Sequence, residues 1–321
     1  MGLWQLNADT LARSRFVLSS FAETFAALKL LHAGAGAHPG EQVWLRDHLP
    51  GYRGLLAADP VSGALVRAAL GRAWIADFFC PTQTDQESFA ETVGRVRATP
   101  PAVARAHLRV SLAGPLPAAL DRDDLPERAA RVLEYVWEET VRPYWARRRR
   151  VLEADVVART AQVSQGGWAA VLDALQPGRT RWLGENRLQI NLHENPPREV
   201  SGAELLFMPV TSKAGWVSWE EPGLYAIVYP CAGALADPGG RAVPTGLGTL
   251  LGASRAEVLM LLGSPMSTSQ LTGVTGQALG SVGRHLRVLL DAGLVERRRA
   301  GRSVLYSRTA AGEVVVKAAG L

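Results

Sequence analysis

The sequence predicts a mainly helical protein of the α+β class. A helical N-terminal region is followed by a small antiparallel sheet, and the chain closes with a compact module of helices and a hairpin. Apolar residues recur every three or four positions through much of residues 1–175, which is typical of amphipathic helices. Over residues 176–231 short segments rich in β-branched and aromatic residues are bounded by Gly, Pro and Asn, which is typical of strands.

The composition is that of a globular protein with more than one folded unit. The chain has 321 residues, of which 47% are hydrophobic and 20% charged, enough for two or three packed units. No apolar run approaches the roughly 18 residues that cross a bilayer, and the first residues lack a secretory signal pattern. Cys80 and Cys231 form no CxxC motif, which favours two reduced thiols. We therefore expect a cytoplasmic protein with no membrane partner.

Local signals place the helices of the first 175 residues. Ser20-Phe-Ala-Glu23 has the pattern of a capping box and opens an apolar run that closes at Gly34. Pro126 suits the first turn of a helix, whereas Pro143 is expected to interrupt one. Further helices are predicted over residues 86–97, over 102–110, from 126 to the break at 143, and from 144 to about 163.

The β-rich part ends in a connector. Strands are predicted over residues 181–183, 188–192, 205–210 and 224–229. Residues 232–244 are rich in Gly, Ala and Pro, and we place the main domain boundary there. The predicted organisation is an N-terminal region of residues 1–231, helical to 175 and β-rich from 176, a connector of residues 232–245, and a C-terminal domain of residues 246–321.

The C-terminal domain reads as three helices and a hairpin. Capping boxes at Ser254–Glu257 and Ser267–Gln270 open the first two helices, and the third is predicted from Ala278 to Asp291 with Gly293 as its stop. A strand from Leu294, a tip at Arg299-Ala-Gly-Arg302 and a returning strand over residues 303–306 follow. This order of elements is the ground plan of a winged helix-turn-helix.

Charge points to an anionic partner for this domain. Between residues 284 and 308 there are seven arginines against Asp291 and Glu296, a balance of +5 that equals the net charge of the whole chain. Such a concentration on a helix and hairpin is typical of nucleic-acid binding. The arginines are Arg284, Arg287, Arg297, Arg298, Arg299, Arg302 and Arg308.

The third helix has the pattern of a recognition helix. Its apolar side would hold Ala278, Val282, Leu286, Leu289 and Leu290, and the opposite side Gln277, Gly280, Arg284 and Arg287, with Ser281 at its edge. Glutamine can pair with adenine and arginine with guanine, so Gln277, Ser281 and Arg284 are predicted to face bases. Arg287, Arg298, Arg299 and Arg302 are expected along the DNA backbone.

Two features of this helix stay open. His285 either contacts a phosphate or packs within the domain. Gly280 and Gly283 cost helix stability. Either they let the helix approach DNA closely, or they reflect only the Gly-rich composition of the chain.

These residues carry a resemblance. Ser281–Val295 followed by Arg298–Tyr306 resembles the ArsR family of bacterial winged-helix regulators. Long actinobacterial members with a further N-terminal domain are similar to this chain over Ala8–Phe16, Glu23–Leu31, Arg95–Pro101 and Leu152–Val156, a resemblance that brings no ligand. The family implies a dimeric repressor whose affinity for DNA changes with an effector. Its metal-sensing members have a Cys-x-Cys pair on the helix before the recognition helix, where this chain has Ser267-Thr-Ser-Gln-Leu-Thr272, so no metal site is expected.

Nothing else in the sequence indicates defined chemistry. No GxSxG, HExxH or P-loop motif occurs, so we expect neither an enzyme nor a cofactor. All nine tryptophans precede the C-terminal domain. Each is compatible with ordinary core packing, but together they favour a pocket for an apolar or aromatic effector.

The sequence therefore predicts a homodimeric, sequence-specific transcriptional regulator of double-stranded DNA, in the first place an effector-responsive repressor. Three alternatives stay open. They are an activator, an architectural protein that binds DNA without sequence preference, and an enzyme that uses the winged helix as a scaffold.

Overall fold

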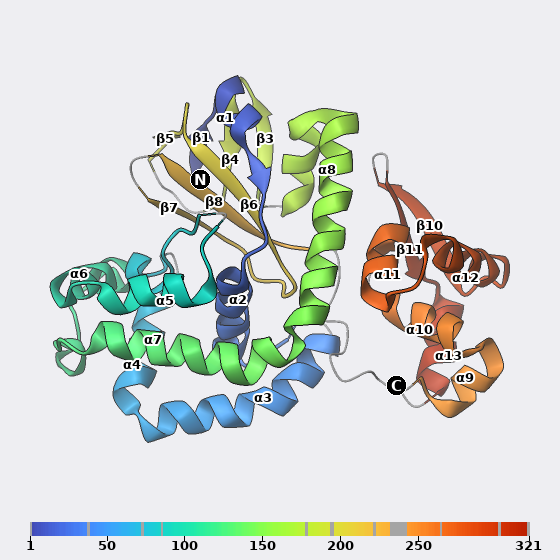
Figure 1. The fold of residues 1–321 in the computed structure, drawn as a ribbon, viewed down its shortest axis with the longest axis horizontal. Helices are drawn as coiled ribbons and strands as arrows, with labels where there is room; N and C mark the ends of the chain where they lie inside the picture. Colours follow the sequence, from blue (N-terminus) through green and yellow to red (C-terminus); the bar gives the residue numbers. More distant parts are fainter. Residues whose placement is uncertain are drawn as a thin grey trace. The chain divides into compact units, whose positions relative to one another are not determined.

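A computed structural model describes most of the chain (Figure 1). The described residues are 2–36, 39–71, 74–84, 86–176, 179–192, 196–220, 223–231, 243–263, 265–300 and 303–319. They form two compact units, and one helical segment from the middle of the chain belongs to the C-terminal unit. Unit 1 comprises Met1–Trp145 and Leu172–Pro230, and unit 2 comprises Ala146–Val171 and Cys231–Leu321. The C-terminal unit thus takes in 26 residues from the middle of the chain (146–171), whereas the sequence suggested a single cut near residue 232.

Helices make up one side of unit 1, and strands the other (Figure 1). Its helices are α1 (Ala8–Arg13), α2 (Ser20–Ala33), α3 (Pro39–Ala58), α4 (Pro60–Ala69), α5 (Phe89–Ala98), α6 (Pro101–Leu112) and α7 (Leu125–Val136), with short 3-10 turns η1 (Asp77–Phe79) and η2 (Ala118–Leu120). The helices predicted around residues 86–97, 102–110 and from 126 are therefore confirmed within a few residues.

The strands of unit 1 form two four-stranded sheets. They are β1 (Leu3–Gln5), β2 (Arg15–Phe16), β3 (Arg181–Gly184), β4 (Arg187–Gln189), β5 (Arg198–Glu199), β6 (Glu204–Val210), β7 (Trp216–Glu220) and β8 (Leu224–Pro230). The strand orders are β3-β4-β1-β5 and β2-β6-β8-β7. The α+β class is confirmed, but in place of the one small antiparallel sheet that the sequence predicts there are two sheets, each with both antiparallel and parallel pairs. β1 lies between β4 and β5 and runs parallel to β5, and β6 lies between β2 and β8 and runs parallel to both.

Helix α2 covers the sheet that contains β6 and β8. Ala22 and Ala26 of α2 pack with Leu206, Met208 and Val228 in one buried cluster. The predicted capping box at Ser20 is wrong, because the helix is capped by Ser19, whose Oγ accepts a hydrogen bond of 2.7 Å from the N–H of Ala22. Glu23 instead turns inward, and its carboxylate accepts from the backbone N–H of Thr211 at 2.8 Å. Gly34 ends the helix at φ 64°, as predicted.

The break at Pro143 is confirmed. Helix α7 passes into a π-helical turn, η3 (Trp137–Val141), and a 3-10 turn, η4 (Arg142–Tyr144), before α8 (Trp145–Leu175) begins. Proline cannot donate the backbone hydrogen bond that a continuous helix needs. Helix α8 has a second break at Gly167, where φ is 73° and ψ 175°.

Unit 2 holds the central part of α8 together with a winged-helix arrangement. Its further elements are α9 (Thr245–Leu251), α10 (Ala253–Leu261), β9 (Met266–Ser267), α11 (Thr268–Thr275), α12 (Leu279–Asp291), β10 (Val295–Ala300), β11 (Ser303–Arg308) and α13 (Ala310–Ala318). The three strands form one antiparallel sheet in the order β10-β11-β9. The predicted capping box of Ser254 is wrong, because α10 begins one residue earlier after Gly252, which has a φ of 80°.

Within unit 2, α8 packs tightly on α11. A Cβ atom at Gly273 of α11 would lie 2.6 Å from the Cβ of Ala154 and 3.0 Å from the carbonyl oxygen of Arg150, so only glycine allows this approach. The Gln270 side chain also donates to the buried Asp155 of α8 at 3.4 Å. The segment of α8 is therefore a structural part of the winged-helix unit.

Among the described residues, no helix is long and apolar enough to cross a membrane.

Candidate nucleic-acid interface

Helix α12 is held by its apolar side. Val282, Leu286 and Leu289 are buried, and the helix packs on α10 and α11. The capping box predicted for α11 is confirmed: the Ser267 hydroxyl accepts from the N–H of Gln270 at 3.3 Å, and the Gln270 side chain accepts from the N–H of Ser267 at 2.7 Å. Gly293 follows α12 at φ 68°. These contacts fix which side of α12 is turned to solvent.

The exposed side of α12 is cationic and has little bulk at its start. Gly280, Arg284 and Arg287 are exposed, as the helical spacing predicted. A Cβ atom built at Gly280 or Gly283 would meet no described atom within 4 Å, so packing inside the protein does not require either glycine. Below we call Gly280, Arg284, Arg287 and the partly exposed Val288 the basic face of α12.

Gln277 lies at a different place from that predicted. It precedes α12, whose N-cap is Ala278, and it is half-buried. Its Nε2 donates to Glu257 of α10 at 3.3 Å, while its Oε1 is buried without a hydrogen-bond partner among the described residues. Gln277 must break its bond to Glu257 before it can reach a base edge.

Ser281 and His285 interact with each other along the helix. The Ser281 Oγ lies 3.2 Å from the His285 Nε2, and both side chains are half-buried. Burial, with smaller contributions from Arg255 and Arg284, lowers the pKa of His285 below its usual value. At neutral pH His285 is therefore an uncharged imidazole, which can bond a phosphate only as a neutral donor.

The antiparallel pair β10 and β11, which we call the wing, separates its arginines. Arg297, Arg298 and Arg299 are all exposed and lie opposite Tyr306, Leu305 and Val304 in the register. Because side chains alternate along a strand, Arg297 and Arg299 project from one face and Arg298 from the other. Arg298 and Arg299 therefore cannot contact a phosphate from the same face of the wing.

Arg308, one of the arginines of the charge count, does not extend this surface. Arg308 is only 11% exposed at its side chain and lies 3.4 Å from the Glu313 carboxylate of α13. Burial lowers the pKa of Arg308, although Glu313 opposes the shift. Arg308 is therefore part of the domain interior. Arg302, predicted at the tip of the wing, lies outside the described residues.

Sequence reasoning missed two residues of this surface. Leu279, the first residue of α12, is 58% exposed beside the basic face, where an apolar side chain can contact the methyl group of thymine. Its departure from the apolar side of the helix was the available signal. Arg255 of α10 acts on His285 electrostatically and adds a half-exposed cation. No sequence spacing connects it to α12.

The described residues contain no group of three or more His, Cys, Asp or Glu side chains that could hold a metal ion.

Comparison with known proteins bears on this surface alone. Residues 254–297, from α10 through the first half of β10, match the family described as bacterial regulatory protein, arsR family. No curated protein matches the chain, and neither does any solved structure.

Proposed function

We propose, starting from the ArsR-family regulator domain that residues 254–297 form, that the protein is a sequence-specific, homodimeric repressor whose affinity for DNA responds to a small molecule. The domain itself is that of a DNA-binding transcription regulator. The exposed basic face of α12 carries the proposal, because it combines exposed cationic side chains with a helix start that lacks bulk. No catalytic step is part of it.

In the proposed complex α12 lies in the major groove. Arg284 is long enough to reach the O6 and N7 atoms of guanine, Leu279 faces a thymine methyl group, and Ser281 remains near the base edges. Arg287 and the arginines on one face of the wing bind phosphates. Gln277 contributes only after release from Glu257.

A homodimer would present two such helices to half-sites about 34 Å apart. Leu250 of α9 is 72% exposed and Val314 of α13 is 65% exposed. Apolar side chains that are open to water on terminal helices are candidates for a dimer contact.

Helix α8 offers a route by which an effector could change the affinity for DNA. Its central residues pack on α11 through Ala154 and Asp155, while the chain continues from α8 into unit 1 at Leu172. A displacement of α8 would act on α11, the helix that positions α12. Asp155 is buried and lies 3.8 Å from Arg159. A buried carboxylate is costly unless its partners stay in place, so a shift of α8 would disturb the contact between Asp155 and Gln270 of α11.

Footprinting on the DNA upstream of the protein's own gene tests the proposal. Wild-type protein should protect two half-sites one helical turn apart. Arg284→Ala should lose this protection, whereas Arg109→Ala, which removes an exposed arginine of α6, should keep it. Protection spread evenly along the fragment would favour an architectural protein. If Arg284→Ala protects the same bases at the same concentration as wild type, the assignment of α12 is wrong.

A further inference from the structure

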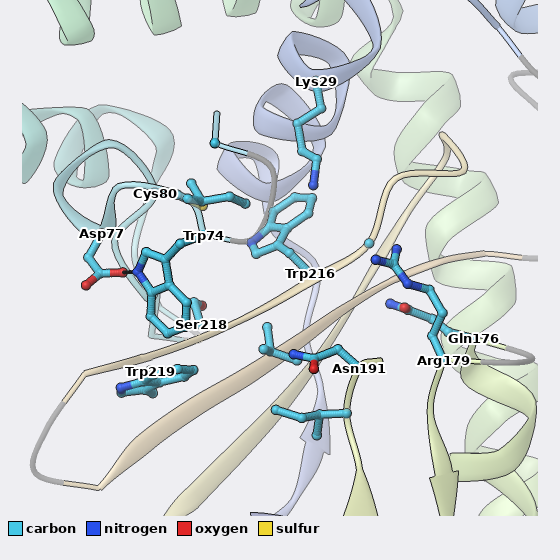
Figure 2. Close-up of a pocket in the computed structure, with 15 residues that line it drawn as sticks. Lys29, Trp74, Asp77, Cys80, Gln176, Arg179, Asn191, Trp216, Ser218 and Trp219 are labelled. Atoms are coloured by element: carbon cyan, nitrogen blue, oxygen red, sulfur yellow. Dashed lines mark hydrogen bonds between the residues drawn. The ribbon is translucent and has the colours of Figure 1, made fainter. Parts of the chain in front are cut away.

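Unit 1 contains a cavity that five separate segments line. Figure 2 shows Lys29 of α2 entering from one side, Arg179 and Gln176 from the segment after α8, and Trp74 and Asp77 from the segment before and within η1. The cavity is also lined by Trp216 and Trp219 of β7 and by Asn191, which follows β4. The cavity volume is about 130 Å³.

Two cations line this cavity without a carboxylate of their own. The Lys29 ammonium lies 5.1 Å from the ring centre of Trp216, and no described residue forms a hydrogen bond or ion pair with it. The same holds for the Arg179 guanidinium among the described residues, although Arg179 is exposed. Burial lowers the pKa of Lys29 to about 8, so the group is still charged at neutral pH. A buried charge without a counterion is costly, and an anionic ligand would remove that cost.

Two other polar side chains of the cavity are hydrogen-bonded within the protein. Asp77 accepts a hydrogen bond of 3.2 Å from the Trp74 indole, and the Gln176 side chain donates to the Val228 carbonyl at 2.7 Å. Gly215 makes room for Gln176, since a Cβ there would lie 2.3 Å from its Nε2. Burial raises the pKa of Cys80 far above its usual value, which leaves it a neutral thiol. With two cations and one carboxylate, the lining carries a net charge of +1.

The remaining surface of the cavity favours a flat apolar body. Trp74 and Trp219 meet edge to face with ring centres 5.0 Å apart, and Trp216 lies beneath Lys29. Aromatic walls of this kind stack with or hold other rings edge-on. At about 130 Å³ the cavity is slightly smaller than the cavity of about 150 Å³ that holds benzene, so it has room for one ring at most.

We propose that the cavity binds a small aromatic monocarboxylate, with the carboxylate at Lys29 and Arg179 and the ring against Trp74, Trp216 and Trp219. That this ligand is the effector rests on the function proposed above. Gln176 and Arg179 directly follow α8, the helix whose central part packs on α11. Occupancy of the cavity would therefore act on the segment that leads out of α8.

Calorimetric titration of the full chain without DNA tests the site. The probes are benzoate, its neutral counterpart benzamide, and phenyl phosphate as a dianion. Benzoate should bind about tenfold or more tightly than benzamide, the value of one charge-assisted hydrogen bond. Lys29→Met should lower benzoate affinity about tenfold and leave benzamide unaffected. The control Lys213→Met, which removes an exposed lysine, should change neither.

Acid–base behaviour gives an independent readout. Benzoate affinity should be constant between about pH 6, where the probe is fully ionised, and about pH 7, and it should fall above pH 8 as Lys29 loses its proton. The Cys80 thiol stays neutral over this range, and Asp77 accepts its hydrogen bond from Trp74. Near pH 8 binding should take up protons, seen as a dependence of the heat on the buffer. This dependence should vanish in Lys29→Met.

Several results would overturn the inference. The proposed site would be wrong if benzoate and benzamide bound with equal affinity, or if Lys29→Met bound benzoate as tightly as wild type. It would also be wrong if millimolar benzoate did not bind. Tighter binding of phenyl phosphate would replace the monocarboxylate by a phosphate ester. If benzoate binds but leaves the affinity for DNA unchanged, the effector role is wrong while the site stands. Because DNA is absent from the first titration, none of its outcomes depends on the regulator proposal.

Discussion

The basic face of α12 and the cavity around Lys29 use cationic side chains in opposite ways. Arg284 and Arg287 are exposed and keep their hydration, so the helix holds them at no cost in desolvation. Lys29 is largely buried, and its lowered pKa reports that cost. An exposed set of charges suits a polyanion whose counterions are released on binding, whereas a buried charge suits one small anion in a fixed place. The same charge thus serves two kinds of partner, and burial separates them.

The largest expected effect concerns stability. Lys29→Met should raise the free energy of unfolding of unit 1 at pH 7 by about 1–3 kcal/mol, because it removes a buried charge and keeps an apolar stem over Trp216. The folded pKa, about 8, lies below the unfolded value of 10.5, so the unfolded chain binds more protons between them. Wild-type stability should therefore rise from pH 8 toward 10.5, and the variant should lack this rise.

Urea denaturation at several pH values measures this difference. Arg284→Met is the matched control from the exposed set, and its stability should remain within about 0.5 kcal/mol of wild type at every pH. A loss of stability in Lys29→Met would mean that the ammonium has a stabilising partner, and the contrast between the two sites would fail.

The second effect concerns affinity. Arg284→Ala should weaken binding to the operator by about 1–3 kcal/mol and relax the preference at one base position. Fluorescence anisotropy with the operator and with single-base variants measures both. A uniform loss of affinity across all sequences would mean that Arg284 contacts the DNA backbone and not a base.

Gly280→Ala decides between the two explanations of the glycine. The substitution should stabilise α12 by about 1 kcal/mol, since its Cβ meets nothing within 4 Å. If the helix approaches DNA at this point, the same methyl group should lower the affinity for DNA. A more stable variant with unchanged affinity would show that Gly280 reflects composition alone.

The smallest effect separates the two faces of the wing. Arg298 and Arg299 project from opposite faces of the wing. Only one of the variants Arg298→Ala and Arg299→Ala should therefore reduce the slope of log affinity against log salt, by about 1. Salt titrations with operator DNA measure the slopes. Equal reductions for both variants would mean that the wing inserts edge-on and contacts phosphates with both faces.

Local signals in the sequence predicted most helices and the plan of the winged helix, because caps, prolines and glycines act within a few residues. Ser267–Gln270 and Gly293 are examples. The failures depend on distant contacts. Glu23 accepts a hydrogen bond from Thr211 instead of completing a helix cap, and Gln277 donates to Glu257 instead of lying on the exposed face of α12. Strand directions could not be predicted, because β1 and β2 pair with segments more than 180 residues away.

The cavity shows the same limit. The sequence favours a pocket from the nine tryptophans together, but Trp4 and Trp44 are buried core residues, while Trp74, Trp216 and Trp219 line the cavity. Lys29 stands in the apolar run Leu28-Lys-Leu-Leu31, which is the only local sign of its burial. That Arg179 and Asp77 lie near it follows from the fold alone.

The central claim is that this chain binds specific DNA through α12 and the wing. Its most direct test is a titration of the full wild-type protein against its own upstream DNA and a scrambled fragment, repeated from low to physiological salt. We expect the affinity for both fragments to fall with salt, while the upstream fragment binds at least about a thousandfold more tightly at physiological salt. Equal affinity for the two fragments at physiological salt would contradict it.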